Sequence, residues 1–173
     1  MTNDAEVARR IKLLRDHGRN DEGDVEMWGF NSRLDNMQAA ILHAQFRDYD
    51  EIVTRRRSIA RLYDELLSSI PSVTLPPAPD SDPDHFDVFQ NYEIEAERRD
   101  ELRAFLLTNG VGTLIQWGGT PVHQFKGLGF NVSLPATERL FERCVMLPLN
   151  MMVTDDEVGY IAELIRDFYL AQG

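Results

Sequence analysis

The fold of this chain is organised around residues 28–40, WGFNSRLDNMQAA, where an irregular polar run turns into a helix. Asn31 and Ser32 can accept hydrogen bonds from the first free helix amides, and Asp35 follows Ser32 by three residues, as in a capping box. Arg33 leaves two interpretations open. It is either a solvated charge beside a capped helix or, with the exposed amides, part of a site for a phosphate or carboxylate.

The helix that starts here is predicted to be long. From Leu34 the apolar residues recur with mostly helical spacing, and no glycine or proline occurs until Pro71. The pattern predicts a helix from Leu34 to about Leu67, on the order of 50 Å long, and such a helix usually bridges two structural units. Its arginines at positions 55–57 are interpreted as a solvated face rather than a phosphate site.

The residues before this stretch predict a short helix and a loop. Residues 4–14 carry apolar side chains on one helical face, and Gly18 follows where a C-terminal turn needs a glycine. Residues 19–27 are polar and have no period. They form either an exposed loop or a segment covered by something outside this sequence.

The last hundred residues alternate between predicted strands and helices. Strands are expected at 73–75, 86–94, 111–117 and 145–148, and helices at 97–109, 135–144 and 154–168. The last helix begins with a capping box formed by Thr154 and Glu157. This order predicts an α/β layer of three or four short strands covered by helices, with no internal repeat.

A glycine-rich loop, residues 118–127, follows the predicted strand that ends at Trp117 and carries His123, Gln124 and Lys126. Loops at strand ends are common ligand contacts. The Gly-Lys-Ser/Thr pattern of nucleotide sites is absent, so the loop is a weak phosphate signal by itself. On these residues alone His123 is either a surface histidine or a ligand contact, and we expect no bound metal.

Composition restricts the partners. The chain has 173 residues, 43% of them hydrophobic, and a formal net charge of −11. This charge repels nucleic acid and anionic membrane surfaces, so we expect neither as a partner. A phosphate held against this field fits a small ligand better than a polymer.

Cys144 is the single cysteine, which favours a reducing compartment. It follows Leu140 and Phe141 at helical spacing, which indicates a small core residue rather than a nucleophile. The sequence contains no apolar run long enough to cross a bilayer and no secretion signal after Met1. We therefore expect a cytoplasmic protein.

Taken in order, these motifs resemble the C-terminal half of the DegT/DnrJ/EryC1/StrS family of pyridoxal-phosphate sugar aminotransferases. Residues 29–40 resemble the family's Gly-Tyr-Asn-x-Arg-Leu…Gln-Ala-Ala motif, and residues 121–124 its Pro-Leu-His-x loop. Residues 1–18 resemble the segment after the family's glycine pair, and residues 56–63 resemble its arginine-rich helix. Residues 89–92 resemble its His-x-Tyr strand, and residues 147–148 resemble its Leu-Pro before the last helix. The resemblance covers nearly all of the chain.

This resemblance implies a fold-type I aminotransferase of α/β (α+β) class, in which a large domain holds the cofactor and a smaller C-terminal domain closes the site of a homodimer. Residues 1–33 are then a remnant of the large domain, residues 34–70 the long connecting helix, and residues 71–173 the small domain with a mixed or antiparallel sheet. The intact enzyme would transfer an amino group, typically from glutamate, to a keto-sugar nucleotide.

The resemblance also implies roles for single residues. Asn31 matches an asparagine that reaches across the dimer to the phosphate of the cofactor, and Arg33 is the nearby cation. His123 matches a histidine near the sugar substrate, with Gln124 beside it. Trp117 stands where the family often has a tyrosine, so an aromatic contact is kept while the hydroxyl is lost.

One family residue has no counterpart. The lysine that forms the Schiff base lies shortly before the position of Met1, and neither Lys12 nor Lys126, the two lysines of this chain, matches it. Without that lysine the cofactor loses its covalent tether and its proton-transfer base. We therefore expect this chain alone to be inactive and to bind pyridoxal phosphate weakly. The alternatives are a non-catalytic module that pairs with a lysine-bearing subunit, and a small enzyme that uses Cys144 and His123.

Overall fold

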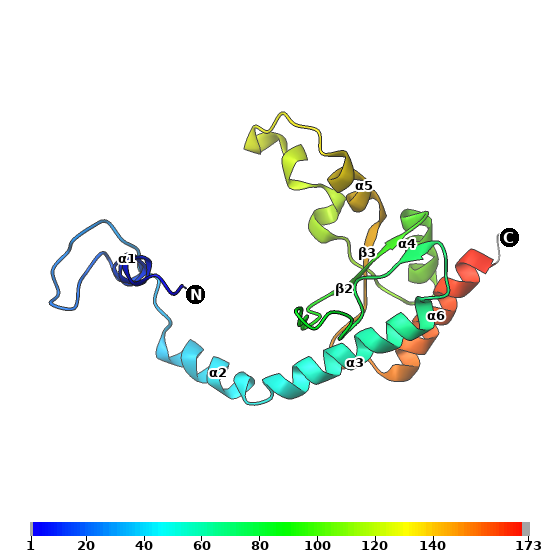
Figure 1. The fold of residues 1–173 in the computed structure, drawn as a ribbon, viewed down its shortest axis with the longest axis horizontal. Coiled ribbons are helices and arrows are strands. Elements are labelled where there is room, and N and C mark those ends of the chain that lie inside the picture. Colours follow the sequence, from blue (N-terminus) through cyan, green and yellow to red (C-terminus); the bar gives the residue numbers. More distant parts are fainter. Residues whose placement is uncertain (1, 171–173) are drawn as a thin grey trace. The chain divides into compact units, whose positions relative to one another are not determined.

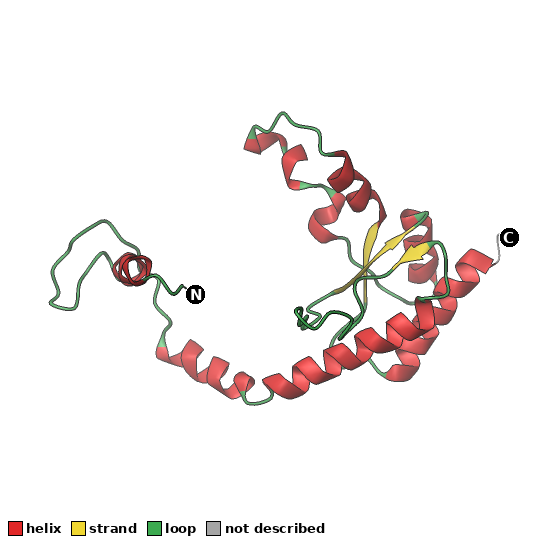
Figure 2. Ribbon diagram, viewed as in Figure 1, coloured by secondary structure: helices red, strands yellow, loops and turns green. Residues whose placement is uncertain are grey.

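The chain divides into two compact units, residues 1–49 and 50–173, in a computed structural model that describes residues 2–170. The first unit holds α1 (Ala5–Arg15) and α2 (Asn36–Phe46). The second holds α3 (Tyr49–Leu67) except for its first residue, and α4 (Arg99–Thr108), α5 (Pro135–Arg143), α6 (Asp155–Leu170) and the sheet (Figures 1 and 2). No helix within residues 2–170 combines the length and the apolar character needed to traverse a bilayer.

The first helix, α1, has well-formed ends. The Asp4 carboxylate accepts the amides of Glu6 and Val7 at 2.9 and 3.0 Å, which satisfies two of the free N–H groups of the first turn. At the other end Gly18, with φ of 78°, donates its amide to the carbonyl of Leu13 at 2.8 Å. Both the predicted helix and its glycine stop are confirmed.

The long helix predicted from Leu34 to about Leu67 is divided in the structure. A turn at residues 47–48 separates α2 from α3, and the amides of Arg47 and Asp48 bond three residues back, each at 3.4 Å. Such i−3 bonds tighten the backbone and end the α-helical ladder. Because the apolar spacing continues through the turn, the sequence pattern did not reveal it.

The capping of α2 also differs from the prediction. The N-cap is Asp35, whose carboxylate accepts the amide of Gln38 at 2.9 Å. Ser32 instead donates its amide to the carbonyl of Arg15 at 2.9 Å and belongs to the turn that follows α1. An aspartate is as good an N-cap as a serine, so the residue expected to be the capping-box partner of Ser32 is itself the N-cap.

The sheet is antiparallel and has the order β1 (Val73–Thr74), β2 (Tyr92–Ala96) and β3 (Cys144–Leu147). This confirms the expected small antiparallel sheet covered by helices. The strand predicted at 86–94 starts only at Tyr92, since Phe89 has a left-handed φ of 50°. The strand predicted at 111–117 is reduced to one bridge between Leu114 and Met146, because the chain turns at Trp117, φ 50°.

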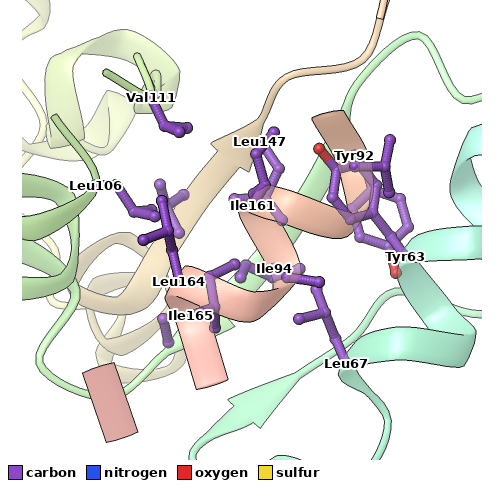
Figure 3. Close-up of a cluster of buried hydrophobic side chains, with 14 of the residues drawn as sticks. Tyr63, Leu67, Tyr92, Ile94, Leu106, Val111, Leu147, Ile161, Leu164 and Ile165 are labelled. Carbon is purple, nitrogen blue, oxygen red and sulfur yellow. The ribbon is translucent and has the colours of Figure 1, made fainter. Parts of the chain in front are cut away.

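A core of buried apolar side chains joins α3, α4, α6 and the sheet, and Figure 3 shows part of it. The rings of Tyr63 on α3 and Tyr92 on β2 stack with centroids 5.0 Å apart, and the Tyr63 hydroxyl donates to the carbonyl of Pro148 at 2.9 Å. The predicted capping box of α6 is confirmed: the Thr154 amide bonds the Glu157 carboxylate at 2.8 Å, and the Glu157 amide bonds the Thr154 hydroxyl at 3.2 Å.

The arginines at positions 55–57 are not the predicted solvated face. Arg56 donates to the carbonyls of Phe89 and Gln90 at 3.0 and 2.8 Å. Arg57 is 5% exposed, donates to the carbonyl of Asp87 at 2.6 Å and forms an ion pair with Asp80. These bonds fix the segment before β2 onto α3. Their partners lie more than twenty residues away, which is why a charge run alone did not predict them.

Candidate functional site

Two of the sequence-predicted site residues, Asn31 and Arg33, lie together in the first unit beside the end of α1. The backbone of Asn31 forms a bridge with Asp16, and the Arg33 guanidinium lies 3.4 Å from the Asp16 carboxylate. Arg19 donates to the same carboxylate at 3.1 Å. The hydrogen bond from Arg19, aided by the charge of Arg33, holds the pKa of Asp16 below its usual value.

A close approach of two backbone segments holds the turn formed by residues 29–33 in place beside the end of α1. A Cβ built on Gly29 would lie 2.3 Å from the amide nitrogen of Gly18, so only glycine fits there. Next to it the Phe30 amide donates to the carbonyl of Leu14 at 2.7 Å, and the His17 amide donates to the carbonyl of Phe30 at 2.9 Å. Gly29 has no left-handed φ, so a glycine is needed here for space.

The donor groups of this turn remain accessible. Asn31 and Arg33 are both exposed, and the Asn31 side chain makes no hydrogen bond with any residue between 2 and 170. A side-chain amide and a guanidinium are suitable donors for a phosphate, although one nitrogen of the Arg33 guanidinium is already paired with the Asp16 carboxylate. The turn therefore carries the chemistry of an anion site.

The other three predicted site residues lie in the second unit, on short 3₁₀ turns η1 (Gln116–Gly119) and η2 (Val122–Gln124). Trp117 is 68% exposed and Gln124 is exposed as well. His123 differs from them, since it is only 9% exposed. The surface-histidine interpretation is therefore wrong for this residue.

His123 is held by a residue that the sequence interpretation missed. Its Nε2 lies 3.0 Å from Oε1 of Glu138, in the first turn of α5. The same oxygen accepts the amide of Leu134 at 2.9 Å. The bond from the Leu134 amide and the bond from His123 lower the pKa of the Glu138 carboxyl. The only sequence signal was an acidic residue in the first turn of a helix that begins with Pro135, which is common and indicates no partner.

The remaining reactive groups do not form a catalytic arrangement of their own. Cys144 is buried in β3, as expected for a core residue, and burial raises the pKa of its thiol to about 11. Lys12 on α1 and Lys126, in the 3₁₀ turn η3 (Lys126–Leu128), are both exposed. Within residues 2–170, no three histidine, cysteine or acidic side chains gather to hold a metal ion.

Comparison with known proteins gives one consistent family. The sequence model of the DegT/DnrJ/EryC1/StrS aminotransferase family matches residues 1–166. The "Pleiotropic regulatory protein" of Geobacillus stearothermophilus is 34% identical over 98% of this chain and 46% of its own length. The dTDP-3-amino-3,4,6-trideoxy-alpha-D-glucose transaminase of Streptomyces venezuelae is 32% identical over 97% of this chain and 44% of its own length.

The solved structures indicate the same family. A DegT DnrJ EryC1 StrS aminotransferase from Brucella abortus has a TM-score of 0.85 and 32% identity, over 97% of this chain and 45% of its own chain. The present chain thus spans about half the length of the curated relatives it matches.

Proposed function

The chain belongs to the DegT/DnrJ/EryC1/StrS aminotransferase family, and we propose that it forms the C-terminal portion of a pyridoxal-phosphate-dependent nucleotide-sugar aminotransferase. The intact enzyme transfers an amino group, typically from glutamate, to a keto-sugar nucleotide. The observation that carries this proposal is the match to the Brucella abortus aminotransferase, which extends over 97% of this chain and 45% of that protein.

In this proposal the parts of the chain have separate roles. Residues 1–33 belong to the large cofactor-binding domain, residues 34–70 form the connecting helical segment, and residues 71–173 form the small domain. The boundary between the two compact units, at residues 49 and 50, falls inside the connecting segment. The enzyme acts as a homodimer in the cytoplasm, with a nucleotide sugar and an amino donor as its small-molecule partners.

The residues of the first unit fit one end of pyridoxal phosphate. Asn31 and Arg33 supply an amide and a guanidinium for the phosphate group of the cofactor. When bound, pyridoxal phosphate carries the amino group between the donor and the sugar. The chain does not supply the tether for the cofactor, because neither Lys12 nor Lys126 occupies the position of the family's lysine. The chain alone is therefore inactive.

The residues of the second unit face the sugar nucleotide. The exposed indole of Trp117 packs against the substrate, and the amide of Gln124 and the ring of His123 bind its polar groups. The side chains of Trp117 and Gln124 are exposed and make no hydrogen bond with the residues that the structure describes, as expected where a ligand supplies the missing contacts. The ring of His123 is held by its contact with Glu138.

A titration with dTDP-glucose tests the substrate assignment. The chain contains two tryptophans, so its indole N–H signals in a proton–nitrogen correlation spectrum are assigned by one Trp117→Phe variant. We expect the Trp117 signal to shift in a saturable manner and the signal of Trp28, in the other unit, to stay in place. A Trp117 signal that does not move at millimolar dTDP-glucose, or an equal shift of both signals, would contradict the assignment.

A further inference from the structure

The His123 ring is bonded at one nitrogen only. Nε2 lies 3.0 Å from Oε1 of Glu138, whereas Nδ1 has no hydrogen-bond partner between residues 2 and 170. Nδ1 is nevertheless not sealed in the interior. Among the described residues, the fully buried side-chain nitrogen and oxygen atoms without a partner are Oη of Tyr92 and Nε of Arg143. Nδ1 therefore keeps contact with the surface although the residue as a whole is only 9% exposed.

The direction of the bond to Glu138 follows from the chemistry of the two groups. An ionised carboxylate can only accept hydrogen bonds, and a neutral imidazole has one N–H and one lone-pair nitrogen. The pKa of Glu138 is lowered, so this group is ionised at neutral pH. Nε2 must then be the donor. The lone pair of the neutral ring lies on Nδ1, at the accessible side.

Glu138 is itself held firmly. Its Oε1 accepts the Leu134 amide at 2.9 Å, which satisfies a backbone donor just before the first turn of α5. The Ser133 hydroxyl lies 3.4 Å from the same oxygen. Capping α5 needs only the bond to Leu134. The carboxylate also bonds His123, which lies on a separate turn 15 residues earlier, so it holds this ring in addition to capping α5.

We propose that Glu138 is a positioning residue that fixes His123 with its proton on Nε2 and presents Nδ1 as an acceptor for a hydroxyl or N–H group of the nucleotide-sugar substrate. The second half of this inference rests on the proposed function; the first half concerns this chain alone. In this arrangement the site discriminates in favour of substrates that bring a donor to His123, since a substrate without one leaves Nδ1 unpaired when water is excluded.

The tautomer can be read directly in the 173-residue chain labelled with nitrogen-15 in histidine. Long-range proton–nitrogen spectra at a pH about two units above the usual histidine pKa of about 6.5 distinguish the protonated nitrogen from the bare one. The His123 signals are assigned with a His123→Gln variant. We expect a protonated Nε2 and a bare Nδ1. A ring protonated mainly on Nδ1, or an equal mixture, would overturn the proposal.

His85 is a control within the same chain, because its Nδ1 rather than its Nε2 faces a carboxylate. Nδ1 of His85 lies 2.6 Å from Oδ2 of Asp82, so the same argument places more of its proton on Nδ1. His17 and His43 are exposed and serve as references for an unconstrained ring. His123 should show a more complete Nε2–H preference than these two residues. A preference equal to theirs would mean that Glu138 fixes nothing.

The variant Glu138→Gln tests whether Glu138 causes the tautomer preference of His123. The same oxygen faces the Leu134 amide and Nε2 of His123, so the amide oxygen of the new glutamine keeps the cap of α5 but is an uncharged and weaker acceptor for His123. We expect the Nε2–H preference of His123 to fall part of the way to that of His17 and His43, with an unchanged circular dichroism spectrum. Glu138→Leu removes the acceptor altogether and should reduce the preference to that of His17 and His43. A preference unchanged in both variants would assign the tautomer to the surrounding packing instead of to Glu138.

Adding dTDP-glucose tests the two halves of the proposal separately: the positioning role of Glu138 and the acceptor role of His123 Nδ1. A shift of the His123 Nδ1 resonance in the wild-type chain, reduced in Glu138→Gln, supports the acceptor role. If the tautomer is as expected but the Nδ1 resonance does not respond to dTDP-glucose, the substrate contact is wrong while the positioning role of Glu138 stands. If the tautomer itself is not as expected, the positioning role fails whatever the ligand does.

Discussion

Oε1 of Glu138 lies 3.0 Å from Nε2 of His123 and joins α5 to the 3₁₀ turn η2. The lowered pKa of Glu138 makes this contact sensitive to acid. A carboxyl whose folded pKa lies below its unfolded value of 4.5 contributes stability that is fully present above about pH 4.5 and is lost as the pH falls through the folded pKa.

The first prediction concerns this pH window. Urea denaturation at pH 7 and again at about pH 3.5 should show a smaller loss of unfolding free energy for Glu138→Gln than for the wild type. Asp16 and Glu157 also have lowered pKa values and remain in the variant, so its loss is reduced but not abolished. Equal losses in both proteins would show that Glu138 is not tied to its partners in the folded state.

The second prediction concerns the core. Tyr63→Phe removes the hydroxyl of a fully buried side chain, which donates to the half-buried Pro148 at its carbonyl, and should lower the free energy of unfolding by about 1–2 kcal/mol. The matched control is Tyr160→Phe, whose hydroxyl donates to the Asn109 carbonyl at an exposed site and should cost less than about 0.5 kcal/mol. Similar costs for the two variants would contradict the buried hydrogen bond.

The third prediction concerns the turn that carries Asn31. Gly29→Ala places a Cβ 2.3 Å from the amide nitrogen of Gly18, so the turn must open. Hydrogen exchange at the Phe30 and Ser32 amides should then become faster. Gly127→Ala is the control, because a Cβ there meets nothing within 4 Å and the backbone has no left-handed φ. Unchanged exchange in Gly29→Ala would refute the close approach.

The fourth prediction concerns Cys144. Its thiol is buried and has a pKa raised to about 11, so very little thiolate is present at pH 8. An aromatic disulfide reagent should therefore react slowly with the folded chain and rapidly after denaturation, and Cys144→Ala should abolish the reaction. Fast labelling of the folded chain would revive the interpretation of Cys144 as a nucleophile.

The sequence predicted those parts of the fold that depend on local patterns. The first helix with its glycine stop at Gly18 and the capping box of Thr154 and Glu157 follow from contacts within a few residues. The turn at residues 47–48 was missed because apolar spacing continues through it. The strand at 111–117 was overpredicted because alternation does not show that Trp117 adopts a left-handed backbone.

The candidate site was predictable only in part for the same reason. Asn31, Arg33, Trp117, His123 and Gln124 were proposed as site residues from motifs, but the contacts of Arg33 and His123 were not predicted. Asp16, which pairs with Arg33, and Glu138, which bonds His123, are separated from their partners by 15 or more residues. No periodicity or spacing rule links side chains across such distances, so only the folded structure brings these residues together.

The most direct test of the central claim is a hybrid enzyme in which this chain replaces the matching C-terminal part of the Streptomyces venezuelae transaminase, which supplies the preceding, lysine-bearing part. The measurement is the absorbance of the bound cofactor after glutamate is added. The account predicts conversion from the aldehyde to the amine form in the hybrid and none in the 173-residue chain mixed with pyridoxal phosphate. A folded, cofactor-loaded hybrid that stays in the aldehyde form, or conversion by the chain alone at catalytic rates, would contradict it.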